Sequence, residues 1–273
     1  MKMPMLWRQS AAFFRMHFNR GLQYRTAALA GVATQFAWGF MKIKVFIAFS
    51  DNPSADFPMG LDQLASYFWL QQAFIAFFMA WMMEAEIFDC ISDGNVAYEL
   101  CRPVRLYAMW FSRSLAVRLV RGLLRCGPIL LAALLMPPPY RLTLPPDPLT
   151  ALWFLLTMAL GLLVMVALCM ILYMLTFFTI SPMGLRLVFV CAVEFLQGAV
   201  IPLPFFSPVM QKVLELLPFA ATENVPLRVY SGQLAGVGLL RAAALQVFWL
   251  AVLVTAGQLL SRLAIRKTTI QGG

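Results

Sequence analysis

The chain has 273 residues, of which 62% are hydrophobic and only 12% are charged. This composition, with a mean hydropathy of +0.79, indicates an integral membrane protein and excludes an ordinary soluble domain. The net charge of +9 does not indicate a nucleic-acid partner, because the basic residues cluster at the ends of apolar stretches, where they set membrane topology. The sequence therefore predicts an all-α integral membrane protein, with residues 1–273 forming a single domain in contact with lipid.

Residues associated with catalysis or metal binding are scarce. The chain has one histidine, His17, and five cysteines without a CxxC pair, so neither histidine-based catalysis nor a thiolate metal site is expected. It has no Gly-Lys dipeptide and therefore no Walker A phosphate-binding loop. We expect no catalytic residue, no metal site and no cofactor in this chain.

Residues 1–25 form an amphipathic segment with an apolar stripe at spacings of three and four residues. The stripe consists of Trp7, Ala11, Phe14, Phe18 and Leu22. Three arginines lie off this stripe. The pattern predicts a helix that rests in the membrane interface, and a plain cytoplasmic tail is the alternative.

Six apolar segments are candidates for membrane spans, each of which needs about 20 residues. They cover about residues 26–49, 62–83, 113–136, 149–180, 184–198 and 239–264. Lys and Arg are concentrated in the segments on one side, so the positive-inside rule places both termini in the cytoplasm. We expect a multi-pass protein of the cytoplasmic membrane.

Residues 84–112 form the longest polar-rich segment between apolar stretches. Acidic residues come first and basic residues follow. The charged residues are Glu84, Glu86, Asp89, Asp93, Glu99, Arg102 and Arg105. Gly94 is a plausible helix C-terminus, and Pro103 starts a new segment. The residues alone are compatible with a solvated connector.

Three arginines occupy one face of the third span. At 100° per residue, Arg118, Arg121 and Arg125 share an arc of about 60°. Exposing three guanidinium groups to lipid is too costly, so this face borders water, headgroups or acidic partners. It lies either at the inner interface or along an inward-facing vestibule that receives an anionic cargo.

The fifth span carries Glu194 and Gln197, which share a helix face at i, i+3. An acidic residue at membrane depth is a candidate for a transport path, or it pairs with a neighbouring helix.

Proline and glycine interrupt the chain after the fifth span. The interrupting residues include Gly198, Pro202, Pro204, Pro208 and Pro218. Proline removes a backbone donor and clashes with the preceding helical turn. We therefore predict an external break with short or re-entrant helices over residues 202–238, before the last span.

Two of these motifs resemble ABC-2 type transporter permeases. Gly198, the IPLPFFSP stretch at residues 201–208, LPF at 217–219 and Pro226 are similar to the fifth-helix region of those permeases. The GNVAYELCRPV stretch at residues 94–104 resembles the loop between their second and third spans.

The resemblance implies a six-span subunit that forms half of the substrate path of an ATP-driven exporter. Two such chains, identical or paralogous, would pair, and two separate ABC ATPase subunits would hold ATP and Mg. It assigns ATPase coupling to Glu84, Glu86, Asp89, Asp93, Gly94, Arg102 and Pro103. The pathway candidates are Arg118, Arg121, Arg125, Glu194 and Gln197, and an outer gate would contain Gly198, Pro202, Pro204, Pro208 and Pro218.

Two alternatives remain open from the sequence. One is a membrane enzyme that acts on a lipid headgroup, and the other is a scaffold subunit that transports nothing. The cargo and the choice between homodimer and heterodimer lie beyond the sequence, and export is implied by the resemblance alone.

Overall fold

The computed structural model describes residues 3–23, 25–50, 57–179 and 181–267. All regular structure in these ranges is helical, which confirms the all-α class. The elements are α1 (Met3–Leu22), α2 (Arg25–Ser50), α3 (Leu61–Ala73), α4 (Ile75–Phe78), η1 (Ala80–Met82), α5 (Ala85–Ser92), α6 (Val96–Leu100), α7 (Leu106–Leu135), α8 (Pro148–Thr176), α9 (Pro182–Leu196), η2 (Leu203–Phe205), α10 (Pro208–Leu216), α11 (Asn224–Tyr230) and α12 (Gly236–Lys267).

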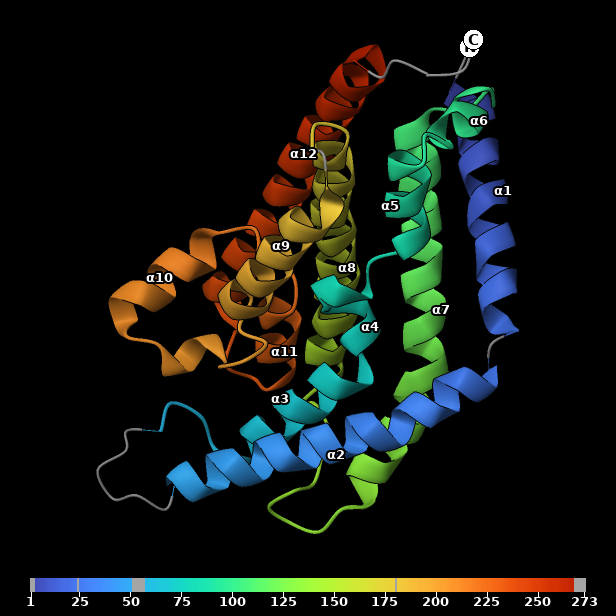
Figure 1. Cartoon of the computed structure of the whole chain (residues 1–273). Helices are drawn as coiled ribbons and strands as arrows, with labels where there is room; N and C mark the ends of the chain where they lie inside the picture. Colours follow the sequence, from blue (N-terminus) through green and yellow to red (C-terminus); the bar gives the residue numbers. More distant parts are fainter. Residues whose placement is uncertain (1–2, 24, 51–56, 180, 268–273) are drawn as a thin grey trace.

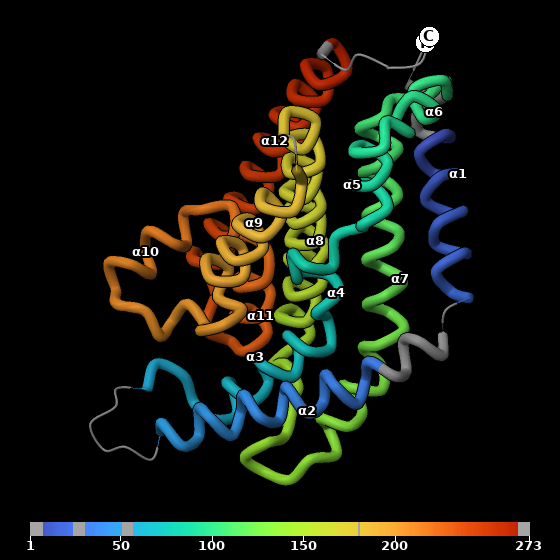
Figure 2. Tube along the Cα trace, viewed as in Figure 1, coloured from blue at the N-terminus to red at the C-terminus, as the bar shows by residue number. Residues whose placement is uncertain are grey.

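The axes of the long helices α7, α8 and α12 are roughly aligned, with α7 antiparallel to the other two, and α1 lies along α7 (Figure 1). Helix α2 takes a different course: it crosses α7 and packs beside α3, as the trace in Figure 2 also shows. The start of α1, the α5–α6 segment and the end of α12 lie at one end of the molecule, whereas the loop between α7 and α8 lies at the other. The two ends of the described chain are therefore on the same side.

Helix α8 is the most enclosed of the apolar helices. In its most apolar window 67% of the residues are buried, against 17% in the corresponding windows of α2 and α12. Gln246 of α12 fixes the packing around α8, because its side-chain amide donates to the carbonyl oxygens of Thr157 (3.0 Å) and Ala221 (2.9 Å). Helices α2 and α12 turn most of their apolar surface outward, as helices that face lipid do.

Three helices in the described part of the chain are long and apolar enough to cross a membrane, at residues 31–50, 148–176 and 236–266. Helix α7 would extend roughly 45 Å at 1.5 Å per residue, but it carries four arginines. Helix α9 has only 15 residues, fewer than the roughly 20 that a bilayer needs. The multi-pass character rests on the three apolar helices, and the count of six spans stays a prediction.

The segment expected to form one span over residues 62–83 differs from a continuous helix. Helix α3 ends at Ala73, α4 has 4 residues and η1 has 3. Neither Gly nor Pro occurs between residues 61 and 83. The interruption therefore depends on contacts with other helices rather than on a local helix breaker.

The other predicted segments correspond to observed elements. Residues 84–112 contain α5, α6 and the first turns of α7. The predicted break at residues 202–238 contains the short helices η2, α10 and α11. Helix α1 covers most of residues 1–25, and its arginines Arg8, Arg15 and Arg20 are exposed. The placement of these segments relative to a membrane stays a prediction.

Asp147 fixes the start of α8. Its carboxylate accepts hydrogen bonds from the backbone N–H of Thr150 (2.8 Å) and from the Thr150 hydroxyl (2.7 Å). The Thr150 hydroxyl, followed by the backbone N–H, lowers the pKa of Asp147 below its ordinary value. Pro148 occupies the first helical position, where its missing N–H costs nothing. The DPLT sequence thus determines where the proline-rich loop ends.

Gly198 ends the α9 segment with a left-handed backbone, φ +88°. We expect Gly198→Ala to destabilise the protein by about 1–2 kcal/mol, because a Cβ is strained in this conformation. The added Cβ would also lie 3.2 Å from the backbone nitrogen of Leu203. Thermal unfolding of the purified protein in detergent measures the effect.

The matched control is Gly184→Ala in α9, where nothing lies within 4 Å of an added Cβ. This variant should stay within about 0.5 kcal/mol of the unchanged protein. Equal unfolding temperatures for the two variants would contradict the strain argument.

Candidate functional site

The candidate residues gather around an interruption of the chain at residues 74–84, between α3 and α5, which we call the helix break. Its short helices leave backbone carbonyl groups without helical partners. Arg118 of α7 enters this gap. Its Nη1 donates to the carbonyl oxygens of Ala76 (3.1 Å), Phe77 (3.2 Å) and Met79 (3.1 Å). One guanidinium group therefore satisfies three main-chain acceptors that are shielded from water.

Two more side chains satisfy the backbone N–H groups of the helix break. Glu194 of α9 accepts the N–H of Ala80 at 3.1 Å. The hydroxyl of Tyr173, in α8, accepts the N–H of Glu84 at 2.9 Å. Helices α7, α8 and α9 each contribute one polar side chain, so the irregular backbone holds the three helices together.

Gly122 allows α4 to lie close against α7. A Cβ at this position would lie 2.1 Å from a ring carbon of Phe77. Without this close approach, the carbonyl groups of α4 would lie beyond the reach of Arg118. The glycine and the arginine, four residues apart on α7, thus act together.

The predicted arginine face divides into two parts. Arg118 is 3% exposed and points into the helix break. Arg121 is exposed and donates to the carbonyl oxygen of Met82 at 3.4 Å, while Arg125 is partly buried. Arg121 and Arg125 line one pocket, and Arg118 does not take part in it. The structure therefore gives Arg118 a packing role and leaves the other two arginines open to a ligand.

Both polar residues predicted on α9 lie at the helix break. Glu194 is partly buried and binds Ala80, as described above. Gln197 is fully buried, and its side-chain oxygen accepts the hydroxyl of Thr222 at 3.1 Å. Its amide nitrogen lies 3.9 Å from the sulfur of Met79. Gln197 thus connects the helix break to the segment that precedes α11.

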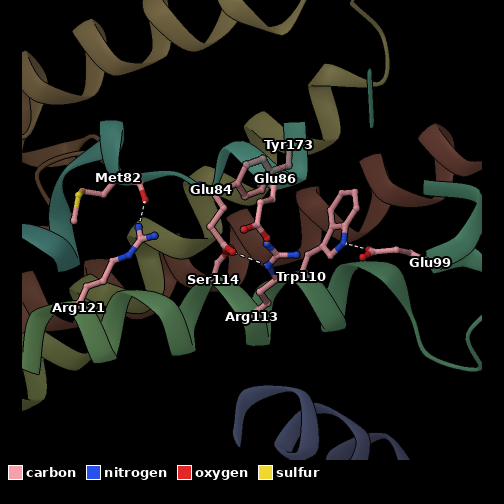
Figure 3. Close-up of polar contacts among 9 residues, drawn as sticks. All are labelled: Met82, Glu84, Glu86, Glu99, Trp110, Arg113, Ser114, Arg121 and Tyr173. Atoms are coloured by element: carbon pink, nitrogen blue, oxygen red, sulfur yellow. Dashed lines mark hydrogen bonds and ion pairs between the residues drawn. The ribbon is translucent and has the colours of Figure 1, made fainter. Parts of the chain in front are cut away.

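The acidic residues at the start of α5 are paired with residues of α7 (Figure 3). Glu84 accepts from Arg113 Nε at 2.6 Å and from the Ser114 hydroxyl at 2.9 Å. Glu86 forms a second ion pair with the same arginine. The side chains of Arg113 and Glu84 are only 14% and 8% exposed, so the pair is shielded from solvent and salt. This ion-pair cluster attaches the base of α5 firmly to α7.

The turn between α5 and α7 presents the other residues predicted for coupling, and we call residues 93–105 the tip. Six of the seven predicted coupling residues are exposed: Glu86 and Asp89 on α5, and Asp93, Gly94, Arg102 and Pro103 in the tip. Tyr98 is 76% exposed at the centre of the tip. The structure thus separates the predicted coupling set into two residues paired with Arg113, buried Glu84 and exposed Glu86, and five exposed residues without that pairing.

Three contacts hold the tip in place. Glu99 accepts a hydrogen bond from the indole N–H of Trp110 on α7 (Figure 3). The side chain of Gln9 on α1 donates to the carbonyl oxygen of Pro103 at 3.3 Å. The guanidinium of Arg102 lies 5.9 Å from the ring centre of Phe13, also on α1. Helices α1 and α7 therefore support the tip from two sides.

The proline-rich segment after α9 forms a connected unit. Pro202 is buried before η2, Pro208 begins α10 and Pro218 follows its end. Pro204 lies within η2. Glu215 of α10 forms an ion pair with Arg228 of α11. The indole N–H of Trp249 on α12 donates to the carbonyl oxygen of Leu216 at 2.9 Å, which attaches α10 to the last helix.

In a comparison with models of protein families, residues 59–272 match the model described as "ABC-2 family transporter protein". The chain belongs to the ABC-2 transporter family. The matched range contains the helix break, the tip and the proline-rich segment. A comparison with curated proteins gives no significant match, and a comparison with solved structures gives none either.

Membership of the ABC-2 family establishes a membrane permease component of an ABC transporter. Such a component works with ABC ATPase subunits and is a transport component rather than an enzyme. Among the described residues, no three His, Cys, Asp or Glu side chains come together to hold a metal ion. The resemblance noted in the sequence is therefore confirmed.

Sequence reasoning missed several residues of the site in this ABC-2 chain. Lys42 is not among the site residues singled out in the sequence, but its Nζ donates to Gln71 Oε1 (2.6 Å) and to the carbonyl oxygen of Ala199 (2.9 Å). It thereby binds the chain just after Gly198. Arg113, at the start of the predicted third span, was given no role there, although it belongs to the ion-pair cluster. Only its position 29 residues after Glu84 could have suggested the pairing, and that is a weak signal.

We expect Arg118→Met to destabilise the ABC-2 permease by about 3 kcal/mol. Methionine keeps much of the volume, but it removes the guanidinium donor from three carbonyl groups of the helix break. That of Met79 still accepts the backbone N–H of Met82 at 3.3 Å. The same substitution at Arg105, which is exposed, is the control and should have little effect. Thermal unfolding in detergent compares the two. If Arg118→Met and Arg105→Met unfold at the same temperature, the assigned role of Arg118 is wrong.

Proposed function

We propose that this chain is the transmembrane subunit of an ATP-driven exporter. Two copies, or one copy and a paralogue, form the substrate path in the cytoplasmic membrane, with both termini in the cytoplasm. Two separate ATPase subunits bind ATP and Mg and act on the tip. The alternation of the permease pair between inward-facing and outward-facing states is a rigid-body change of packed helices.

The observation that carries this proposal is the combination of an exposed tip and a firm base. A docking element must present side chains to its partner, and Asp93, Tyr98 and Arg102 are exposed. It must also transmit displacement without bending, and the buried pair of Arg113 with Glu84 supports such stiffness. In our topology the tip is cytoplasmic because it lies at the same end as the start of α1 and the end of α12.

The path itself is assigned to polar residues of the third and fifth predicted spans. Arg121 and Arg125 line a pocket near α1. Glu194 is partly buried at the helix break, and Gln197 lies one turn further. We place the outer gate at Gly198 and the proline-rich segment, because these residues lie beyond the helix break from the tip. The connection of α10 to α11 and α12 allows the gate to follow movements of those helices.

The proposal predicts that a stoichiometric ATPase subunit co-purifies with the tagged chain from its native cells in mild detergent. Tyr98→Ala should weaken this association by about 2 kcal/mol or more, because exposed tyrosines at the centre of an interface often dominate its binding energy. The amount of retained ATPase and its ATP hydrolysis rate are measured together. The direction of transport is tested by measuring whether ATP drives cargo out of the cells or into them.

The control is Trp38→Ala on α2, an aromatic side chain that is 52% exposed and remote from the tip. This variant should retain the ATPase in full. A chain that purifies alone, with no ATPase after crosslinking, would contradict the proposal. Turnover of a lipid headgroup by that isolated chain would favour a membrane enzyme. Site variants that all leave ATPase binding and transport unchanged would favour a scaffold.

A further inference from the structure

A pocket of about 520 Å³ lies between α1, the start of α5 and α7, on the side of the ion-pair cluster that faces α1. Its polar lining is mainly cationic. The basic side chains are His17, Arg20, Arg113, Arg121 and Arg125. The two acidic lining residues are Glu84 and Glu86, and both are bound to Arg113. The acidic charge of the lining is thus directed to a single arginine.

Three arginines of the pocket have no acidic partner among the described residues. Arg20 is exposed, and Arg121 makes only the long hydrogen bond to the carbonyl oxygen of Met82. Arg125 has a buried Nε without a hydrogen-bond acceptor in the described part of the chain. Arg121 and Arg125 are four residues apart on α7, so their like charges repel each other. An anion between them would relieve this repulsion.

The histidine of the pocket reports the same electrostatic environment. Burial, and then the positive charge of Arg113, lowers the pKa of His17 below its ordinary value. The charge of Arg113, the second of these causes, disfavours a further cation beside His17.

The walls between the cationic groups are apolar. They are formed by Gly21, Met83, Ala85, Val117 and Leu124. A hydrated inorganic ion gains nothing from such walls, but an amphiphile places its charged group on the arginines and its first methylene groups on the apolar surface. The pocket also lies against α1, the helix that the sequence places in the membrane interface.

We propose that this pocket binds a phosphate-bearing anion through Arg20, Arg121 and Arg125, with an anionic phospholipid as the source that its apolar walls favour. Guanidinium groups bind phosphate oxygens through paired, charge-assisted hydrogen bonds. Three of them line the pocket from two helices, α1 and α7. The bound lipid connects α1 to α7 and fills a space that the side chains leave open.

The test measures lipid binding to the purified full-length chain by native mass spectrometry. Phosphatidylglycerol, neutral phosphatidylcholine and inorganic phosphate are titrated separately. We expect phosphatidylglycerol to bind more tightly than phosphatidylcholine. The double variant R121Q/R125Q should weaken phosphatidylglycerol binding by about tenfold for each guanidinium–phosphate contact that is lost. The matched control R105Q/R141Q removes the same charge from two exposed sites and should bind as the unchanged protein does.

A third variant, R20Q, keeps the proposal testable if the double variant misfolds, because Arg20 is exposed on α1. It should also bind phosphatidylglycerol more weakly than R105Q/R141Q does. If inorganic phosphate binds, phosphatidylglycerol does not, and the same variants weaken phosphate binding, the ligand is free phosphate rather than a phospholipid. Equal binding of phosphatidylglycerol and phosphatidylcholine without phosphate binding, or unchanged binding by R20Q and R121Q/R125Q, would overturn the inference. The assay contains no ATPase, so a negative result leaves the proposed export function intact.

Discussion

The contact between Arg118 and three backbone carbonyl groups is the constraint on which the architecture depends. A helix that is interrupted inside an apolar protein leaves carbonyl and N–H groups unpaired, and each such group costs several kcal/mol if nothing binds it. Here the carbonyl groups bind Arg118, and two N–H groups bind Glu194 and Tyr173. Side chains from three helices thereby offset the free-energy cost of the interruption. The same side chains then fix α7, α8 and α9 around the helix break.

This arrangement explains how polar residues can be numerous in an apolar chain without forming a catalytic centre. Arg118, Glu194 and Gln197 are engaged with backbone or with neighbouring side chains, so their polarity serves the fold. Arg121 makes a long hydrogen bond of 3.4 Å to the carbonyl oxygen of Met82, and the buried Nε of Arg125 has no acceptor among the described residues, although both lie on the same helix as Arg118. The distinction between the two groups comes from burial and partners rather than from residue type, and it separates packing residues from residues available to a ligand.

The sequence was sufficient for the class, the family and the positions of the tip and the proline-rich segment, because glycine, proline and charged residues mark these features locally. It could not show the helix break at residues 74–84. That stretch is rich in Phe and Met and has no helix-breaking residue. Its interruption follows only from contacts with residues that are between 39 and 118 positions away in the chain. For the same reason Glu84 was assigned to an exposed coupling surface, although its carboxylate is bound to Arg113 and Ser114. The role of Lys42 depends on the distant carbonyl group of Ala199 and was equally inaccessible.

The unequal enclosure of the long helices has a consequence for how this chain evolves. A side chain on α8 is surrounded by other protein atoms, so a change of even one methylene disturbs its neighbours. The outward surfaces of α2 and α12 require only that their side chains remain apolar, and Leu, Val, Phe and Met are interchangeable there. Substitutions should accumulate quickly on those two surfaces and slowly along α8. Distant relatives of this protein should therefore share the residues of α8 and its partners while they differ in almost every lipid-facing position.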